Sequence, residues 1–153
     1  MGTRYKGTSE EIRALNTYIK LQRASESVIQ RTTDHLSDYN LTLSQFSALE
    51  ALYHLGTLSQ VDVARKLLKS TGNITTVLKN LEKRDLITRE RNSADNRYMD
   101  VAITQQGRDL IEGMLTKHIA GIVDEMAILS AEEQEELARL CKKLGLQATA
   151  ASG

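Results

Sequence analysis

The sequence predicts a mainly α fold that carries one small β-hairpin (α+β). Apolar residues recur at helical spacing over most of the 153 residues, and strand-like alternation is confined to about residues 87–103. Proline is absent and aromatic residues make up only 4% of the chain. This composition favours long, uninterrupted helices over a β-sandwich.

The composition is that of an ordinary globular protein, with 41% hydrophobic and 26% charged residues. We therefore expect a single domain over residues 1–153. The sequence has no run of 18 or more apolar residues and no basic start followed by an apolar block. These absences predict a cytoplasmic protein with no membrane partner. The single cysteine, Cys141, fits a reducing compartment.

The first predicted helix begins at Thr8-Ser9-Glu10-Glu11, which has the pattern of a capping box. Apolar residues at roughly helical spacing extend it to Tyr39-Asn40, giving one helix of about 30 residues. Its apolar positions are sparse, so a helix of this length needs a partner surface from this chain or from a second copy.

Three shorter helices are predicted next. Thr42 opens the first of them with another capping box and Gly56 ends it, while Ser59 caps the second. Ser70 begins the third, whose buried stripe is predicted to be Ile74, Val77, Leu78 and Leu81. Two short helices joined by a tight polar turn form a helix-turn-helix arrangement.

The face opposite that stripe is short, polar or cationic. At about 100° per residue it carries Gly72, Thr76, Lys79 and Lys83, flanked by Asn73, Thr75 and Asn80. Asn and Thr can read base edges in the major groove, and Lys can meet base acceptors or phosphates. However, any exposed helix face is polar, and helix-turn-helix geometry also occurs in protein-binding modules.

A β-hairpin is predicted after Leu86, where the apolar period changes from helical to alternating. Residues 92–96 form a turn of small and polar residues between two strands. The stalk is expected to pack on the helices while its flexible, basic tip projects beyond them. Behind a helix-turn-helix, such a hairpin is a wing whose tip arginine can enter a narrow minor groove.

The positive charge lies in the middle of the chain. The whole chain has 20 basic and 20 acidic residues, but residues 65–97 contain nine basic and four acidic residues, a net charge of +5. The preceding segment carries −1 and the following segment −4. A local basic patch on a neutral protein indicates a nucleic-acid surface, although a solvated helix face can look similar.

Two stretches resemble the MarR family of bacterial winged helix-turn-helix transcriptional regulators. Residues 95–104, DNRYMDVAIT, resemble the family's wing signature, with Ile103 in place of the usual Leu. Residues 81–87, LEKRDLI, resemble the end of its recognition helix, with Asp85 where Gly is common. The resemblance covers nearly the whole chain. It implies a DNA-binding core over about 42–104, flanked by helical dimerisation regions over about 8–40 and 105–145.

The resemblance also implies roles for matching residues. Arg97 would enter the minor groove, and Asp95 would brace the wing tip. The remaining predicted contacts to double-stranded DNA come from the recognition helix and the first wing strand. They are Ser70, Thr71, Asn73, Thr75, Thr76, Lys79, Arg89 and Arg91.

The last two helices are predicted to begin at Thr104 and at Ser130. Gly145 is predicted to end the helix that begins at Ser130. With the first helix, the resemblance implies that they form a homodimer that reads a pseudo-palindromic operator. It also implies release by a small-molecule effector, whose identity the sequence does not give. The predicted interface residues are Ile12, Leu15, Ile19, Ile119, Ile122, Val123, Met126, Leu137, Leu140 and Leu144.

No catalytic or metal site is predicted. His35, His54 and His118 lie on different predicted helices without ligand spacing, so polar surface or interface positions are favoured over zinc. Cys141 has the pattern of a small, buried apolar residue instead of a redox sensor. We find no phosphate-binding glycine loop and no nucleophile with a base, and we expect no cofactor and no enzymatic activity.

We therefore predict a sequence-specific transcriptional regulator, a repressor in the first instance, that binds DNA as a homodimer. One alternative is a winged-helix module that contacts another protein and does not bind specific DNA. Salt distinguishes the two, because binding through several phosphates weakens steeply as salt rises. A regulator without any effector would share every DNA-binding feature.

Overall fold

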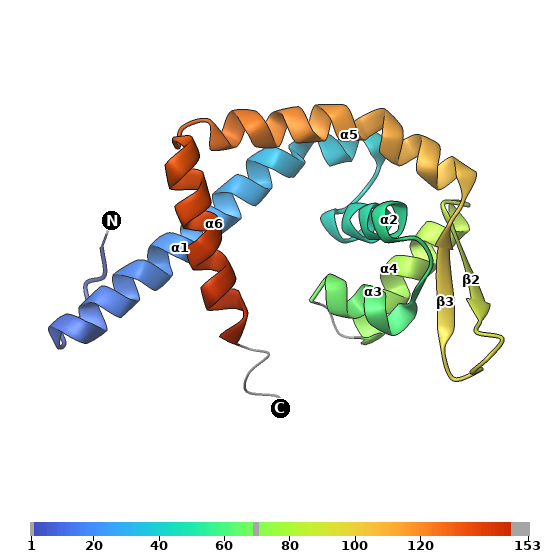
Figure 1. Ribbon diagram of the computed structural model, residues 1–153, viewed down its shortest axis with the longest axis horizontal. Helices are drawn as coiled ribbons and strands as arrows, with labels where there is room; N and C mark the ends of the chain where they lie inside the picture. The colour runs from blue at the N-terminus through green and yellow to red at the C-terminus, as the bar shows by residue number, and fades with distance from the viewer. Residues whose placement is uncertain (1, 69–70, 148–153) are drawn as a thin grey trace. The chain divides into compact units, whose positions relative to one another are not determined.

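The computed structural model describes residues 2–68 and 71–147, which form helices and one small antiparallel sheet (Figure 1). The chain has two compact units, residues 1–118 and 119–153, and the boundary falls within α5. No helix in the described part of the chain is long and apolar enough to cross a membrane. The elements are α1 (Ser9–Thr33), η1 (Asp34–Tyr39), α2 (Leu43–Leu55), β1 (Leu58–Ser59), α3 (Gln60–Lys66), α4 (Thr71–Lys83), β2 (Ile87–Arg91), β3 (Met99–Ile103), α5 (Gln105–Met126) and α6 (Ala131–Gly145).

The long first helix is shorter than predicted. α1 ends at Thr33, and a tighter 3₁₀ helix, η1, continues to Tyr39. The Thr33 hydroxyl donates a hydrogen bond to the Ile29 carbonyl at 2.6 Å, and such side-chain bonds compete with continuation of an α-helix. Asn40 then adopts a left-handed conformation, with φ of 52°, and ends the segment.

Most of the predicted helix boundaries are confirmed. Thr8, Thr42 and Ser130 form complete capping boxes, and the Ser59 hydroxyl caps α3 by accepting from the Asp62 N–H. The predicted cap at Ser70 lies outside the described residues. α6 ends at Gly145, as predicted, and Leu146 follows it in right-handed helical geometry.

The sheet has three strands in the order β1-β3-β2. The predicted hairpin is confirmed, with Ile87 opposite Ile103 and Arg91 opposite Met99. β1 was not predicted, since its two residues are too few to show alternation. It pairs with β3 through Leu58 and Val101, and so joins the base of the wing to the start of α3.

The core lies within the first unit, where the helix-turn-helix, the sheet, η1 and the first half of α5 pack together. Three predicted stripe residues of α4, Ile74, Leu78 and Leu81, are completely buried, whereas Val77 is partly buried. The wing contributes Ile87 and Val101 from its inner face. The orientation of α4 and the position of the wing are therefore fixed by the same set of packed side chains. The other buried apolar residues are Leu36, Leu41, Phe46, Ala48, Leu49, Leu52, Val63, Ala64, Leu86, Ile111 and Met114.

Two histidines on different predicted helices come together. His118 on α5 is only 7% exposed, and its ring centroid lies 5.1 Å from that of His35 and 4.6 Å from that of Phe46. His35 Nε2 and His118 Nδ1 are buried without a hydrogen-bond partner among the described residues. The described ranges contain no group of three or more His, Cys, Asp or Glu side chains that could hold a metal ion.

This pair is expected to make stability depend on pH. Burial, and then the nearby charges of His118 and Lys117, lower the pKa of His35 below its ordinary value of 6.5, and Asp38 opposes them. The unfolded chain therefore binds this proton more readily than the folded chain. The resulting stability is complete above pH 6.5 and is lost as the pH falls from 6.5 through the lowered pKa.

Chemical denaturation at several pH values between about 8 and 5 measures this loss. The variant His35→Phe should lose less free energy of unfolding over this range than the unmodified protein. His54→Gln is the matched control, because His54 is exposed on α2 and its ring contacts Tyr53 and not the buried pair. Identical pH profiles for His35→Phe and the unmodified protein would contradict the prediction.

Candidate nucleic-acid interface

α4 presents the polar face that its sequence predicts. Thr76, Lys79 and Lys83 are exposed, as is Asn73, while the apolar stripe on the other side is buried. Ser70 lies outside the described residues, and the Thr71 side chain is likewise not described. The face has the chemistry of a helix that enters the major groove.

Thr75 has a structural contact that the sequence did not suggest. The Gln60 side-chain amide, at the start of α3, donates a hydrogen bond to the Thr75 hydroxyl at 2.6 Å. Thr75 lies on α4, contacts the start of α3 and is only partly exposed. This contact joins the two helices of the helix-turn-helix and helps to fix the orientation of α4.

The first turn of α2 lies beside α4. Thr42, Ser44 and Gln45 line a shallow hollow together with α4 residues that include Asn73 and Thr76. Sequence reasoning missed this neighbourhood. The capping box at Thr42 indicated where α2 begins, but only the packed structure brings that helix end next to the recognition helix.

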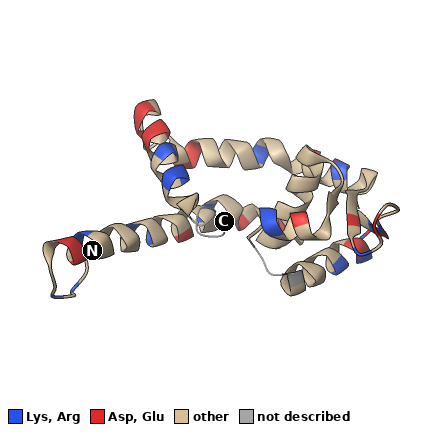
Figure 2. Ribbon diagram, turned by 60° about the horizontal axis from the view of Figure 1, so that its bottom comes forward, with Lys and Arg blue, Asp and Glu red and all other residues tan. Residues whose placement is uncertain are grey.

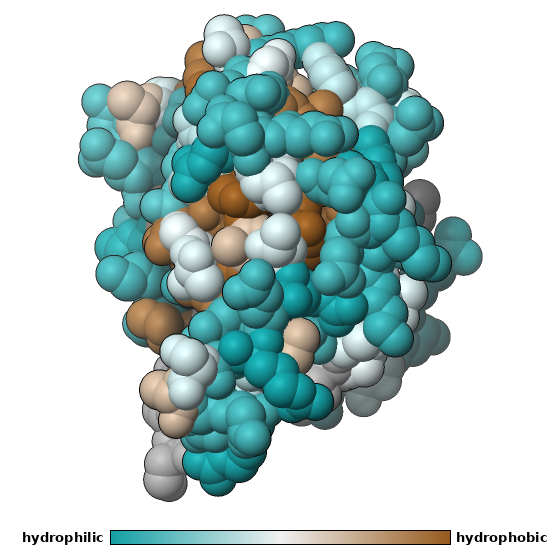
Figure 3. Space-filling view, turned by 90° about the vertical axis from the view of Figure 1, so that its right-hand side faces the viewer, coloured by the Kyte–Doolittle hydropathy of each residue, from teal (hydrophilic) through white to brown (hydrophobic). Residues whose placement is uncertain are grey.

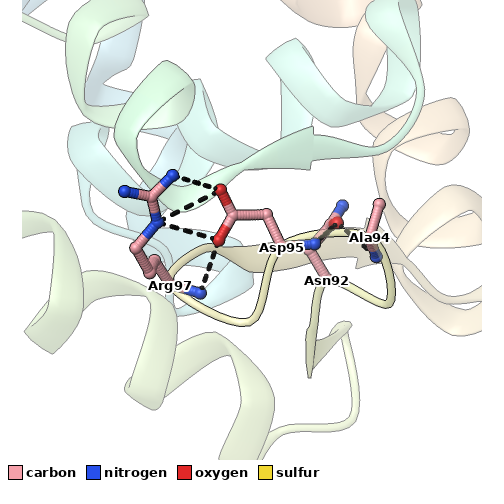
Figure 4. Close-up of polar contacts among 4 residues, drawn as sticks. All are labelled: Asn92, Ala94, Asp95 and Arg97. Atoms are coloured by element: carbon pink, nitrogen blue, oxygen red, sulfur yellow. Dashed lines mark hydrogen bonds and ion pairs between the residues drawn. The ribbon is translucent and has the colours of Figure 1, made fainter.

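The wing tip is built from an Asn-centred turn (Figure 4). The Asn92 side-chain oxygen accepts hydrogen bonds from the backbone N–H groups of Ala94 and Asp95, at 2.9 and 2.8 Å. Its amide group donates to Asp100 at 2.8 Å. Arg91 adds a bond from Nη1 to the Asn96 carbonyl at 2.7 Å. These bonds brace the backbone of the tip.

Asp95 holds Arg97 in place, as the family resemblance implied. Arg97 donates from Nε to Oδ1 at 3.0 Å and from Nη2 to Oδ2 at 2.7 Å, and its backbone N–H also donates to Oδ1 (Figure 4). These hydrogen bonds lower the pKa of Asp95 and raise that of Arg97. The Arg97 side chain remains 79% exposed, and its Nη1 group does not contact Asp95. One edge of the guanidinium therefore points away from the pair and can meet a ligand.

The two arginines of β2 differ in their surroundings. Arg91 is exposed near the tip, whereas the Arg89 side chain is only 14% exposed and pairs with Glu82 of α4. Alternation already put Arg89 on the same side of the strand as Ile87, and that side proves to be the packed one. Strand alternation did not predict that its partner on that side would be Glu82.

Arg84 is a further contact that sequence reasoning missed. Its guanidinium donates to the carbonyl oxygens of Asn40 and Tyr39, at 2.7 and 3.1 Å. This links the end of α4 to the corner between η1 and α2. The recognition helix is thus fixed at its carboxyl end by groups far away in the sequence.

The surface formed by α4 and the wing carries basic and hydrophilic residues. Figure 2 shows basic residues along the end of α4 and on the wing, with acidic residues among them. The surface on the side of β2 and β3 is mainly hydrophilic, with a smaller apolar area near its centre (Figure 3). A polar helix face, a braced arginine and local positive charge together form a surface suited to a polyanion.

A recognition helix followed by a wing defines the class of winged helix-turn-helix transcriptional regulators. Residues 41–98 match the model of the MarR family. The chain is 32% identical over 136 residues to the HTH-type transcriptional regulator MhqR of Bacillus subtilis (strain 168). The matched region covers 89% of this chain and 94% of that protein. The chain therefore belongs to the MarR family. It is a DNA-binding transcriptional regulator and not an enzyme.

Solved structures of similar chains agree with this assignment. The S. aureus MepR–DNA complex has a TM-score of 0.74 and 26% identity, covering 92% of this chain and 98% of that chain. Bordetella bronchiseptica BpsR has a TM-score of 0.69 and 26% identity, covering 82% and 98%. The BpsR structure concerns the mechanism by which 6-hydroxynicotinic acid regulates the DNA binding of that protein.

Proposed function

We propose that this regulator is a repressor that binds a pseudo-palindromic operator as a homodimer. The recognition helix α4 enters the major groove and the wing enters the adjacent minor groove. The observation that carries this proposal is Arg97, which Asp95 braces at the wing tip while leaving the side chain 79% exposed. Such an arginine is suited to the negative potential of a narrow minor groove.

The homodimer is proposed from apolar side chains that lack cover within their own unit. In the second unit, α6 has no buried residue although Leu137, Leu140 and Leu144 form a stripe along it. The carboxyl end of α5 exposes Ile119, Ile122 and Val123. In the first unit, α1 also has no buried residue, with Ile12, Leu15 and Ile19 partly exposed. Exposed apolar stripes of this extent indicate a protein–protein contact.

Two-fold symmetry makes the operator geometry a definite expectation. A dimer with one recognition helix per copy reads two half-sites about one helical turn, ~10 bp, apart or slightly more. A DNA-binding regulator acts where the chromosome is, so we expect the protein in the bacterial cytoplasm. An effector would release the DNA by binding one dimer shape more tightly than the other. The regulated DNA binding described for BpsR supports such control.

The experiment that tests this function is selection of bound fragments from a genomic DNA pool, followed by titration of the recovered duplex at several salt concentrations. A scrambled duplex of equal length is the control. Preference for the recovered duplex with a steep negative salt slope would support the proposal. Equal binding of both duplexes, or a flat salt dependence, would contradict it.

The wing gives the first mutational prediction. Arg97→Ala should weaken binding to the recovered duplex by about 1–3 kcal/mol, because one groove contact is lost. The free energy of unfolding should change little, since the Asp95–Arg97 pair is on the surface. Ser93→Ala, at an exposed position on the same tip, is the control and should bind normally. Unchanged affinity for Arg97→Ala would remove the wing from the proposed interface.

A further inference from the structure

The starting observation is an ion pair that joins the wing stalk to the recognition helix. Arg89 of β2 donates from Nε and from Nη2 to the same Glu82 carboxylate oxygen, at 3.0 and 2.7 Å. The Arg89 side chain is 14% exposed and that of Glu82 40% exposed. Glu82 lies in the last turn of α4, next to Lys83. The contact therefore connects the two elements that are proposed to enter different grooves.

The position of Arg89 in the sheet explains why it can make this contact. It lies opposite Val101, which is completely buried, and on the same side of β2 as the buried Ile87. Its charged group is thus largely withdrawn from solvent and faces α4. A guanidinium that is largely buried needs a carboxylate partner to compensate its lost hydration. The two hydrogen bonds from Arg89 to Glu82 also restrict the orientation of the guanidinium more than a single bond would.

We propose that Arg89 is a positioning residue: through Glu82 it fixes the wing relative to the recognition helix and does not itself bind DNA. This rests on the proposed function of α4 and the wing. DNA binding is most favourable when both elements already have the spacing of the two grooves, because no ordering cost is then paid on binding. An acidic residue this close to the proposed DNA surface would by itself weaken DNA binding. In this proposal, Glu82 offsets that cost by holding Arg89.

Glu82→Gln gives opposite predictions for the two possible roles of Arg89. If Arg89 bound DNA directly, neutralising Glu82 would free its charge and strengthen binding. If Arg89 positions the wing, Glu82→Gln weakens binding to the recovered duplex. Glu90→Gln is the matched control, because Glu90 is an exposed residue of the same strand and its loss measures the general effect of removing one negative charge.

We expect Glu82→Gln to bind about threefold to thirtyfold more weakly than Glu90→Gln, which lies within the range typical of coupled neighbouring residues. Affinity of Glu82→Gln equal to or above that of Glu90→Gln would overturn the inference. Circular dichroism and the unfolding midpoint of both variants confirm that the comparison is between folded proteins.

A double-mutant cycle between Arg89→Gln and Arg97→Ala tests positioning directly. In Arg89→Gln the wing is no longer held beside α4, so Arg97 contacts DNA less well. The loss of DNA affinity caused by Arg97→Ala should therefore be smaller in the Arg89→Gln background than in the unmodified protein. Two independent DNA contacts would instead give additive losses. Additivity, together with a reduced salt slope for Arg89→Gln, would show that Arg89 contacts DNA and would refute the positioning role.

A measurement without DNA separates this inference from the proposed function. Amide hydrogen exchange over residues 87–103 should be faster in Glu82→Gln than in Glu90→Gln, because the stalk loses its attachment to α4. Unchanged exchange would overturn the positioning role even if the unmodified protein binds its duplex. If no duplex is recovered from the genomic pool, the proposed function fails, and the exchange result still decides whether Arg89 holds the wing.

Discussion

Leu140→Glu is expected to convert the proposed homodimer into a monomer and to abolish binding to the proposed operator. Leu140 is 47% exposed in the middle of the α6 stripe, so burying the rest of its side chain contributes roughly half of the ~1.5–3 kcal/mol of a fully buried leucine. Two-fold symmetry introduces the change in both copies, so the dimer should lose roughly 1.5–3 kcal/mol of apolar burial and also has to desolvate two carboxylates. A monomer reads one half-site only and keeps mainly salt-dependent, non-specific affinity for DNA.

Ala138→Glu is the matched control for this change. Ala138 is also exposed on α6, but helical spacing turns it about 100° or more away from the leucine stripe. Sedimentation or light scattering at several protein concentrations measures the oligomeric state, and titration of the recovered duplex measures binding. If Leu140→Glu and Ala138→Glu have the same oligomeric state and affinity, α6 is not part of the dimer interface.

Gly107→Ala should be strongly destabilising. Gly107 lies in the first turn of α5, where a Cβ would collide with the Leu86 carbonyl oxygen and would approach Ile103 Cγ1 to 2.8 Å. The Leu86 oxygen cannot move away easily, because it accepts the Thr104 N–H at 3.1 Å. Overpacking of this kind costs about 1–3 kcal/mol, and contact with backbone puts the expected loss near the upper end of that range. Chemical denaturation measures the change.

Gly113→Ala provides an internal comparison on the same helix. A Cβ at Gly113 meets nothing within 4 Å, so the substitution should follow helix propensity and stabilise the protein by about 0.5–1 kcal/mol. The two glycine substitutions should therefore have opposite signs. A stabilising or neutral Gly107→Ala would mean that the packing of α5 against the base of the wing is looser than described.

The elements of the candidate site were largely predictable, whereas their contacts were not. The stripe of Ile74, Leu78 and Leu81 fixed which face of α4 is buried and therefore which face is exposed. The change of period after Leu86 located the wing. The partner of Arg89 was not predictable, because helical and strand periods describe one element at a time and do not say which side chains of two elements will meet.

The errors in the first helix and the sheet have similar causes. Apolar spacing alone did not distinguish the 3₁₀ geometry of η1 from an α-helix, since both can bury Leu36. β1 owes its existence to pairing with β3, and two residues have no period of their own. In both places the local signal was weak and packing against distant residues decided the conformation.

By itself, the sequence determined the helix caps, the helix-turn-helix, the hairpin and the polar face of α4, because these depend on neighbouring residues and on periodic burial. Only the tertiary structure decided that Glu82 would hold Arg89, that Arg84 would reach the carbonyls of residues 39 and 40, and that His35 would meet His118. These contacts join residues of different elements, and they arise when the core packs those elements into one arrangement.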